Sequence, residues 1–106
     1  MSYDIDIYVD HQDGYTSGFE VGNMTSNVAR MTRAACGVPL SWFNDVSCEK
    51  ALPILAFCWR QLKRYPDFYR VLEVKDWGSY DDFMPYLTRF YAMVRLHPTG
   101  TIRVGW

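Results

Sequence analysis

Few side chains of this 106-residue chain could do acid–base chemistry near neutral pH. It has two histidines, His11 and His97, and no recognisable catalytic or phosphate-binding motif surrounds either of them. His11 lies in a stretch typical of a hairpin turn, where a solvated polar residue is expected. His97 ends a long helical pattern just before Pro98, where a partial positive charge is favoured by the helix dipole. We therefore predict that the protein is not an enzyme.

Carboxylates offer a second kind of chemistry, the binding of a divalent cation. Asp4 and Asp6 alternate with apolar residues and so project from one face of an expected strand, where Glu20 of a neighbouring strand could join them. Metal sites usually draw their ligands from loops or from several elements. A solvated sheet face with Arg103 as counter-charge is therefore the favoured interpretation. We predict neither a metal nor a cofactor.

The three cysteines, Cys36, Cys48 and Cys58, are odd in number and contain no closely spaced pair. Zinc sites and disulfide frameworks need closer or paired spacing. We expect all three to be small buried hydrophobic residues.

The best indication of function is the aromatic content, which reaches 17% and includes four Trp and eight Tyr. In residues 59–70 basic and aromatic side chains are interleaved, a mixture that favours protein interfaces and also stacks on bases. Trp42 and Phe43, in an expected loop, and Trp77, beside Gly78, are poor core candidates by position. Two interpretations stay open: a binding surface, or a second small core beside a solvated basic helix face.

Charge is divided unevenly along the chain. Residues 1–29 contain five acids and no Lys or Arg, whereas residues 30–106 contain seven acids and eleven bases, for a net charge of −1. This dipolar distribution does not favour nucleic acid as the partner. The longest apolar run, 51–59, is far shorter than the roughly 20 residues that span a bilayer, and the N-terminus is acidic, unlike a signal peptide. We expect a single cytoplasmic domain over residues 1–106, with no membrane association.

Hydrophobic periodicity predicts the elements that must position these residues. The fold class is expected to be α+β, a two-layer sandwich. A mostly antiparallel three-stranded sheet, with the last strand beside the first, packs its apolar face against helices. The expected strands are 3–9, 16–21 (with a bulge near Gly18) and 101–106. The expected helices are 26–36, 48–64 and 80–97, with a short one near 67–73 and a loop over 38–46.

Two segments, 47–66 and 79–98, align without a gap. Either a helical unit was duplicated or the two helices share the same start and stop signals. Each carries a proline that either falls in the first turn, if the helices begin near residues 50 and 82, or bends a continuous helix. The matched pairs include Ser47 with Ser79, Pro53 with Pro85, Trp59 with Tyr91, Leu62 with Val94, and Pro66 with Pro98.

Five short motifs resemble those of a group of small bacteriophage and actinobacterial proteins with no established activity. They are an opening Y-D-I, N-x-T-x-N-V-x-x-M at 23–31, A-x-P-I-L at 51–55, W-G-x-Y at 77–80 and T-x-R-V at 101–104. This chain departs from the group in having Asp76 where a glycine precedes the tryptophan. The resemblance implies a phage or bacterial setting. It also implies that Asn23, Thr25, Asn27, Trp77, Gly78 and Tyr80 form one surface, although helix capping and loop anchoring explain them equally well.

We therefore expect a non-enzymatic binding protein, phage-encoded, that binds a host or anti-phage-defence protein. The alternative is a pocket for a nucleotide-like small molecule, with Arg30, Arg33 or Arg64 on the phosphate and Trp77 or Trp42 as a lid. Trp77 is expected either to fill the gap between the two long helices or to anchor an interface. The candidate binding residues are Trp77, Gly78, Tyr80, Asn23, Thr25, Asn27, Trp42, Phe43, Arg64, Tyr65 and Tyr69.

Overall fold

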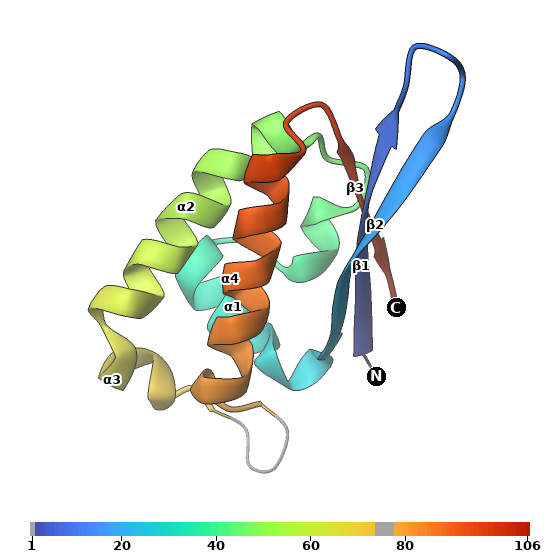
Figure 1. The fold of residues 1–106 in the computed structure, drawn as a ribbon. Coiled ribbons are helices and arrows are strands. Elements are labelled where there is room, and N and C mark those ends of the chain that lie inside the picture. Colours follow the sequence, from blue (N-terminus) through green and yellow to red (C-terminus); the bar gives the residue numbers. More distant parts are fainter. Residues whose placement is uncertain (1, 74–77) are drawn as a thin grey trace.

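The computed structural model describes residues 2–73 and 78–106 and shows a three-stranded antiparallel sheet packed on one face against a layer of helices (Figure 1). This confirms the expected α+β fold. The elements in chain order are β1 (Ser2–Asp10), β2 (Thr16–Thr25), the 3₁₀ helix η1 (Ser26–Val28), α1 (Ala29–Cys36), the 3₁₀ helix η2 (Leu40–Phe43), α2 (Cys48–Arg64), α3 (Pro66–Arg70), α4 (Tyr80–Leu96) and β3 (Thr101–Gly105).

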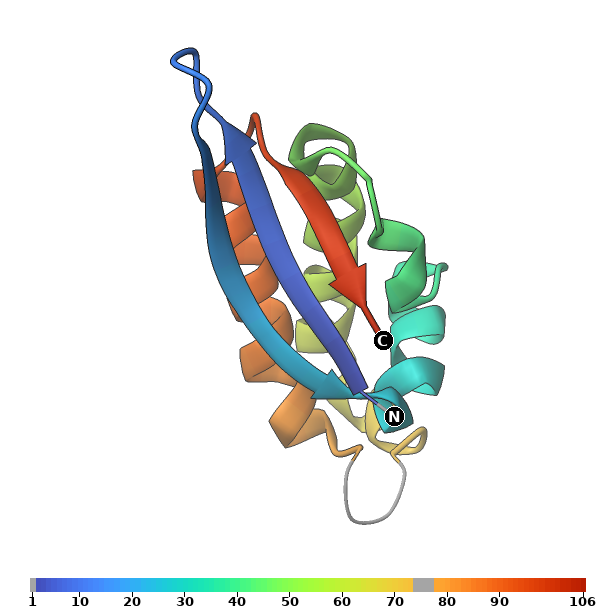
Figure 2. The ribbon, with the colours of Figure 1, turned by 90° about the vertical axis from the view of Figure 1, so that its right-hand side faces the viewer.

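The sheet has the order β2-β1-β3, so the last strand lies beside the first, as expected. Ile5 and Ile7 face the helices and lie opposite Val104 and Ile102 of β3, and all four are buried. Figure 2 shows that the β1–β2 hairpin extends beyond the helices. Within residues 2–73 and 78–106, no helix covers the other face of the sheet (Figure 2).

Strand β2 is longer than expected and its irregularity lies elsewhere. The pairing register shifts between Ile5 and Asp6, where Gly22 and Glu20 are the partners and Val21 is the extra residue. Gly22 has a φ of 143°, a conformation that glycine adopts at little cost. The expectation of a bulge at Gly18 was therefore wrong.

The helices α2 and α4 are each continuous over seventeen residues. The hydroxyl oxygens of Ser47 and Ser79 accept hydrogen bonds from the backbone N–H groups of Lys50 and Asp82, so both serines are N-caps. The internal prolines of the two helices consequently lie inside the helix, beyond the first turn. Of the two alternatives, the later start near residues 50 and 82 is excluded, and the expected bounds 48–64 and 80–97 agree with the structure to within one residue. Among the described residues, no helix is both long and apolar enough to cross a bilayer.

A disulfide joins Cys36 at the end of α1 to Cys58 in the middle of α2, and only Cys48 is a free, buried thiol. The expectation of three unlinked cysteines was wrong. The two residues are 22 positions apart in the sequence, but α1 packs against α2 and brings their Cα atoms to 4.7 Å. Sequence spacing alone does not reveal such a pair.

The segment expected as a loop at 38–46 contains η2, and this short helix delivers Phe43 into the core. Phe43 has no solvent exposure and packs edge-to-face against Phe90 of α4, with ring centroids 5.4 Å apart. Its description as a poor core candidate was wrong. Trp42 is half-buried and packs against Phe43 from outside.

Candidate functional site

Three residues of the surface implied by the sequence resemblance meet at η1. Thr25 caps this helix by accepting a hydrogen bond from the backbone N–H of Asn27. A Cβ at Gly78 would lie 2.8 Å from the carbonyl oxygen of Asn27, so only glycine allows this close approach. Asn23 lies on β2, where its amide donates to the carboxylate of Asp4 at 2.7 Å. Thr25 thus caps a helix, Gly78 packs closely on it, and Asn23 joins two strands, so each of these contacts is structural.

Tyr80 and Tyr69 are buried, and the contacts of Tyr80 are internal. The Tyr80 hydroxyl donates to the carbonyl oxygen of Leu62 at 2.7 Å, and the Arg70 guanidinium lies 4.5 Å from the centre of its ring. Arg70 also makes two hydrogen bonds to the Asp81 carboxylate, which lower the pKa of that carboxyl group. Tyr80 therefore joins α4 to α2.

The remaining sequence candidates are spread over the helical layer. Lys50 covers the Trp42 ring at 5.6 Å, near the start of α2, whereas Arg64 covers Tyr65 at 5.5 Å, at its end. Both Arg64 and Tyr65 are exposed. Arg30 and Arg33 are exposed on α1, and Trp77 lies outside the described residues.

The described side chains instead form a continuous aromatic and basic surface where α2 meets α4. Trp59 of α2 and Tyr91 of α4 contact each other with ring centroids 5.9 Å apart, and the Trp59 indole N–H donates to the Thr88 hydroxyl at 3.0 Å. The Lys63 ammonium lies 5.3 Å from the Trp59 ring centre, and the Arg95 guanidinium lies 5.4 Å from that of Tyr91. We call Trp59, Lys63, Thr88, Tyr91 and Arg95 the α2–α4 seam.

The gap-free alignment of 47–66 with 79–98 extends to the seam. Trp59 aligns with Tyr91, and the cation four residues later is Lys63 in the first segment and Arg95 in the second. In a helix, residues four apart lie on one face, which places each cation above its own ring. Tyr91 and Arg95 were absent from the sequence candidates, although the repeated aromatic–cation spacing could have identified them.

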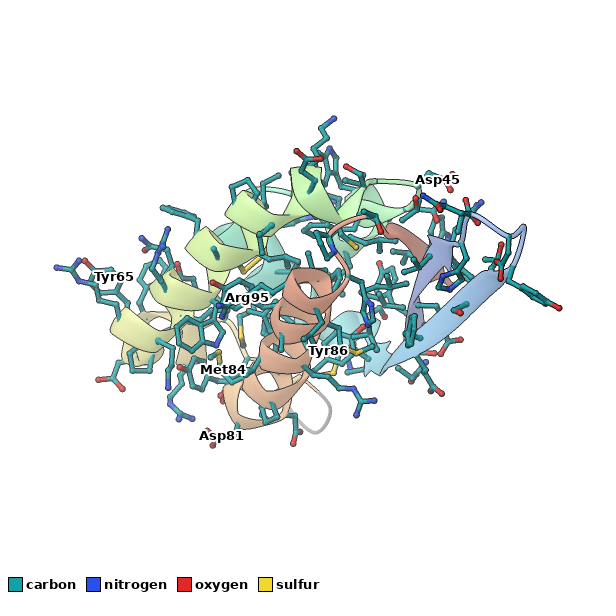
Figure 3. All side chains as sticks on the ribbon, turned by 45° about the horizontal axis from the view of Figure 1, so that its top comes forward. Asp45, Tyr65, Asp81, Met84, Tyr86 and Arg95 are labelled. Carbon is teal, nitrogen blue, oxygen red and sulfur yellow. A yellow bond between two sulfur atoms is a disulfide. The ribbon has the colours of Figure 1, made fainter. Side chains whose placement is uncertain are left out.

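The seam lies on the side of the helices turned away from the sheet. In Figure 3, Met84 and Arg95 lie on the side of α4 that faces α2, whereas Tyr86 lies on the side that faces the sheet. A shallow hollow of about 600 Å³ lies beside the seam, lined by Lys63, Met84, Thr88 and neighbours. Two large exposed apolar side chains line neighbouring hollows. Phe57, with 51% of its area exposed, shares one with Trp59 and Lys63, and Leu96, with 73% exposed, shares another with Arg95.

Positive charge on this surface is largely unopposed. Within residues 2–73 and 78–106, the ion pairs formed by arginine are those of Arg70 and Arg103. Beside the seam, the exposed cations with no ion pair in the described chain are Arg60, Lys63, Arg64, Arg89 and Arg95. Away from it, Arg30 and Arg33 on α1 and Lys50 at the start of α2 are likewise exposed and form no ion pair there. An arrangement of cations and aromatic rings on an open helical surface can bind a partner that supplies carboxylates and apolar groups.

The uncovered sheet face has the opposite charge. Asp4, Asp6 and Glu20 lie close together there, and burial, Glu20 and Asp4, in that order of size, raise the pKa of Asp6. Arg103 lies opposite Asp6 in the sheet register, but its guanidinium pairs with Asp45 at 2.6 Å. The expectation that Arg103 is the counter-charge of the acidic face was therefore wrong.

Replacing Asp6 with asparagine is expected to stabilise the protein at pH 7. In wild type the raised folded-state pKa makes ionisation of Asp6 unfavourable to folding, a cost that is present above the folded pKa and absent below the unfolded value of 3.8. The Asp6→Asn variant should unfold at a higher urea concentration than wild type at pH 7 and at the same concentration near pH 3. A midpoint that is unchanged or lower at pH 7 would contradict this electrostatic account.

The two histidines lie apart and in structural contacts. His11 is exposed in the hairpin and is 2.8 Å from the Ser17 hydroxyl, while His97 stacks on Phe19 with ring centroids 4.1 Å apart. Among the described residues, no group of three or more His, Cys, Asp or Glu side chains is placed to hold a metal ion.

The fold and surface together define an α+β domain with a basic, aromatic helical face and an acidic sheet face. Searches against protein-family models, curated proteins and solved structures found no match to this chain. The resemblance to the phage group stays a prediction, and function must be argued from the geometry.

Proposed function

We propose that the chain is a non-enzymatic binding protein that recognises another protein through the α2–α4 seam and the residues beside it. The observation that carries the proposal is the pair of contacting rings, Trp59 and Tyr91, each covered by a cation that makes no ion pair in the described chain. Trp, Tyr and Arg are the side chains most enriched in the energetic centres of protein interfaces, and the seam contains one of each.

The chemistry of the surface supports binding rather than catalysis. A catalytic site needs a nucleophile or base within hydrogen-bonding reach of the reacting group, usually in a concave pocket. The seam offers cations, rings and the Thr88 hydroxyl, which is already engaged by Trp59, over a hollow that is shallow and open. The phage setting implied by the sequence makes a bacterial host or anti-phage-defence protein the expected partner.

A nucleotide-like ligand is the competing function. It would need the arginines and Trp42 to converge, yet Trp42 lies beneath Lys50 at the start of α2, whereas Arg64 is its last residue. At 1.5 Å per residue, Lys50 and Arg64 are roughly 21 Å apart along this helix, a span longer than a mononucleotide contact. This separation favours the protein partner.

The proposal predicts that removing exposed apolar groups beside the seam abolishes capture of a partner. The immobilised protein should retain one stoichiometric protein from a bacterial lysate, and the Phe57→Ser/Leu96→Ser variant should retain less than a tenth of that amount. Both side chains are exposed, so their loss should change stability by less than about 0.5 kcal/mol each. The retained proteins are eluted from the immobilised chain, and mass spectrometry identifies and quantifies them.

The matched control is Tyr15→Ser, since Tyr15 is 72% exposed at the tip of the hairpin, away from the helices. Its capture should equal that of wild type. The proposed function would be contradicted if no protein were retained over a range of salt concentrations. It would also be contradicted if free nucleotides, and no protein, raised the melting temperature of the chain.

A further inference from the structure

We infer that the partner presents an acidic amphipathic helix to the α2–α4 seam, with two carboxylates that flank one large apolar side chain. This inference rests on the proposed function and adds the chemistry of the partner. It is carried by the spatial order of the seam and by the charges around it.

The order of groups along the seam follows from the direction of the helices. Figure 1 shows α2 and α4 side by side and running in opposite directions. Because each cation follows its ring by four residues, Lys63 and Arg95 lie at opposite ends of the Trp59–Tyr91 contact. Each is one helical turn, roughly 6 Å, from the ring pair, so the two cation positions are roughly 12 Å apart along the helices.

This spacing matches one face of an α-helix. A rise of 1.5 Å per residue places side chains roughly 12 Å apart when they are seven or eight residues apart in sequence, and the residue four positions along lies between them on the same face. A partner with Glu, a large apolar residue and Glu at positions i, i+4 and i+7 therefore sets its carboxylates against Lys63 and Arg95. Its apolar side chain then meets Trp59 and Tyr91.

The two cations of the seam are preorganised for this contact in the free protein. Lys63 and Arg95 lie over aromatic rings, and the Trp59 ring is itself fixed by its hydrogen bond to Thr88. Immobilising a long side chain on binding costs about 0.5–1.5 kcal/mol, and a cation already resting on a ring has lost part of this freedom. The exposed Leu96 and the half-buried Met84 add apolar area at the edge of the seam.

Charge at the borders of the seam favours a short acidic helix over a long polyanion. Asp82 is exposed in the first turn of α4, at the end of the seam nearest Lys63, next to Asp81, whose carboxylate is paired with Arg70. A nucleic acid strand that continued past the seam would meet these carboxylates, and it would also be repelled by the acidic sheet face. A helix of a few turns ends before them.

The test uses defined peptides rather than an unidentified partner. The probe is a fluorescein-labelled, acetylated and amidated 15-residue alanine-based helix with Glu, Leu and Glu at i, i+4 and i+7. The comparison peptide has the same composition, but its second Glu is at i+6. That position lies on a different face of the helix from the first Glu and the Leu. Binding is measured by fluorescence anisotropy. The first peptide should bind at least tenfold more tightly than the second, because only the first aligns both carboxylates with the seam.

Charge reversal locates the contact. The Lys63→Glu/Arg95→Glu variant should bind the first peptide at least tenfold more weakly than wild type does. The charge-matched control Lys50→Glu/Arg30→Glu alters exposed cations outside the seam and should change binding less than twofold. Equal binding of the two peptides, insensitivity to the seam variant, or preference for a 15-nucleotide thymidine strand over the peptide would each overturn the inference.

The proposed function is tested separately by the lysate experiment. A captured protein that is lost with Phe57→Ser/Leu96→Ser but kept by Lys63→Glu/Arg95→Glu would leave the proposed function standing and refute the acidic helix. Capture of no protein would refute the proposed function itself.

Discussion

Replacing Phe43 with alanine is expected to destabilise the protein by about 3–5 kcal/mol, the range found when a large buried aromatic residue is truncated. Phe43 has no exposed area and packs against Phe90, so its removal leaves a cavity between η2 and α4 and deletes an aromatic contact. Urea denaturation monitored by circular dichroism gives the free energy of unfolding. We expect the midpoint to fall while the slope is unchanged.

The control for this truncation is Tyr15→Ala, which removes an aromatic side chain of similar size that is 72% exposed. Its effect should be less than about 0.5 kcal/mol. If Phe43→Ala had an effect as small as that of the control, η2 would not contribute to the core, and the account of residues 38–46 given above would be wrong.

Loss of the disulfide should have the next largest effect, about 3 kcal/mol. The bond between Cys36 and Cys58 closes a loop with a sequence separation of 22, and in the chain-entropy account a loop of this length restricts the unfolded state by that amount. Cys36→Ser is the preferred variant because Cys36 is only half-buried, whereas Cys58 has no exposure. Its urea midpoint is compared with that of the oxidised wild type.

Two further measurements check this result. A reducing agent should lower the midpoint of wild type to that of Cys36→Ser and leave the variant unchanged. Oxidised wild type, unfolded without reductant, should have one titratable thiol, that of Cys48. Three thiols in protein purified under air, together with a midpoint insensitive to reductant, would show that the bond does not form.

The two charged faces have a consequence for self-association. A symmetric dimer through the seam would place the same cations against each other, and one through the sheet would oppose Asp4, Asp6 and Glu20 with their copies. Both arrangements are repulsive. The charges therefore oppose both symmetric dimers.

Local patterns in the sequence were sufficient for the elements and for the fold class. Alternating Ile5, Ile7 and Val9 predicted β1, and the serine caps followed by long amphipathic runs predicted α2 and α4. These features depend on neighbours within one turn or one strand, so the periods of 3.6 and 2 residues expose them directly. The position of β3 beside β1 also followed, because few topologies bury both apolar faces.

The candidate site was only partly accessible to the same reasoning. Residues 59–70 were identified as basic and aromatic, but Tyr91 entered only as the position aligned with Trp59, and Arg95 was not singled out. Tyr69 and Tyr80 were taken as surface candidates, yet both are buried, because composition does not say which face of a helix meets the core. Trp77, another of the predicted binding residues, lies outside the described residues.

Tertiary structure alone decided the contacts between distant parts of the chain. The Cys36–Cys58 bond, the burial of Phe43 against Phe90, and the meeting of Trp59 with Tyr91 each join residues from different helices. Their side chains carry no local signal of these partners, because each contact arises from how the helices pack on the sheet and on one another. The sequence by itself determined the helices and strands, and their packing determined which side chains became core, which became a disulfide and which were left together at the surface.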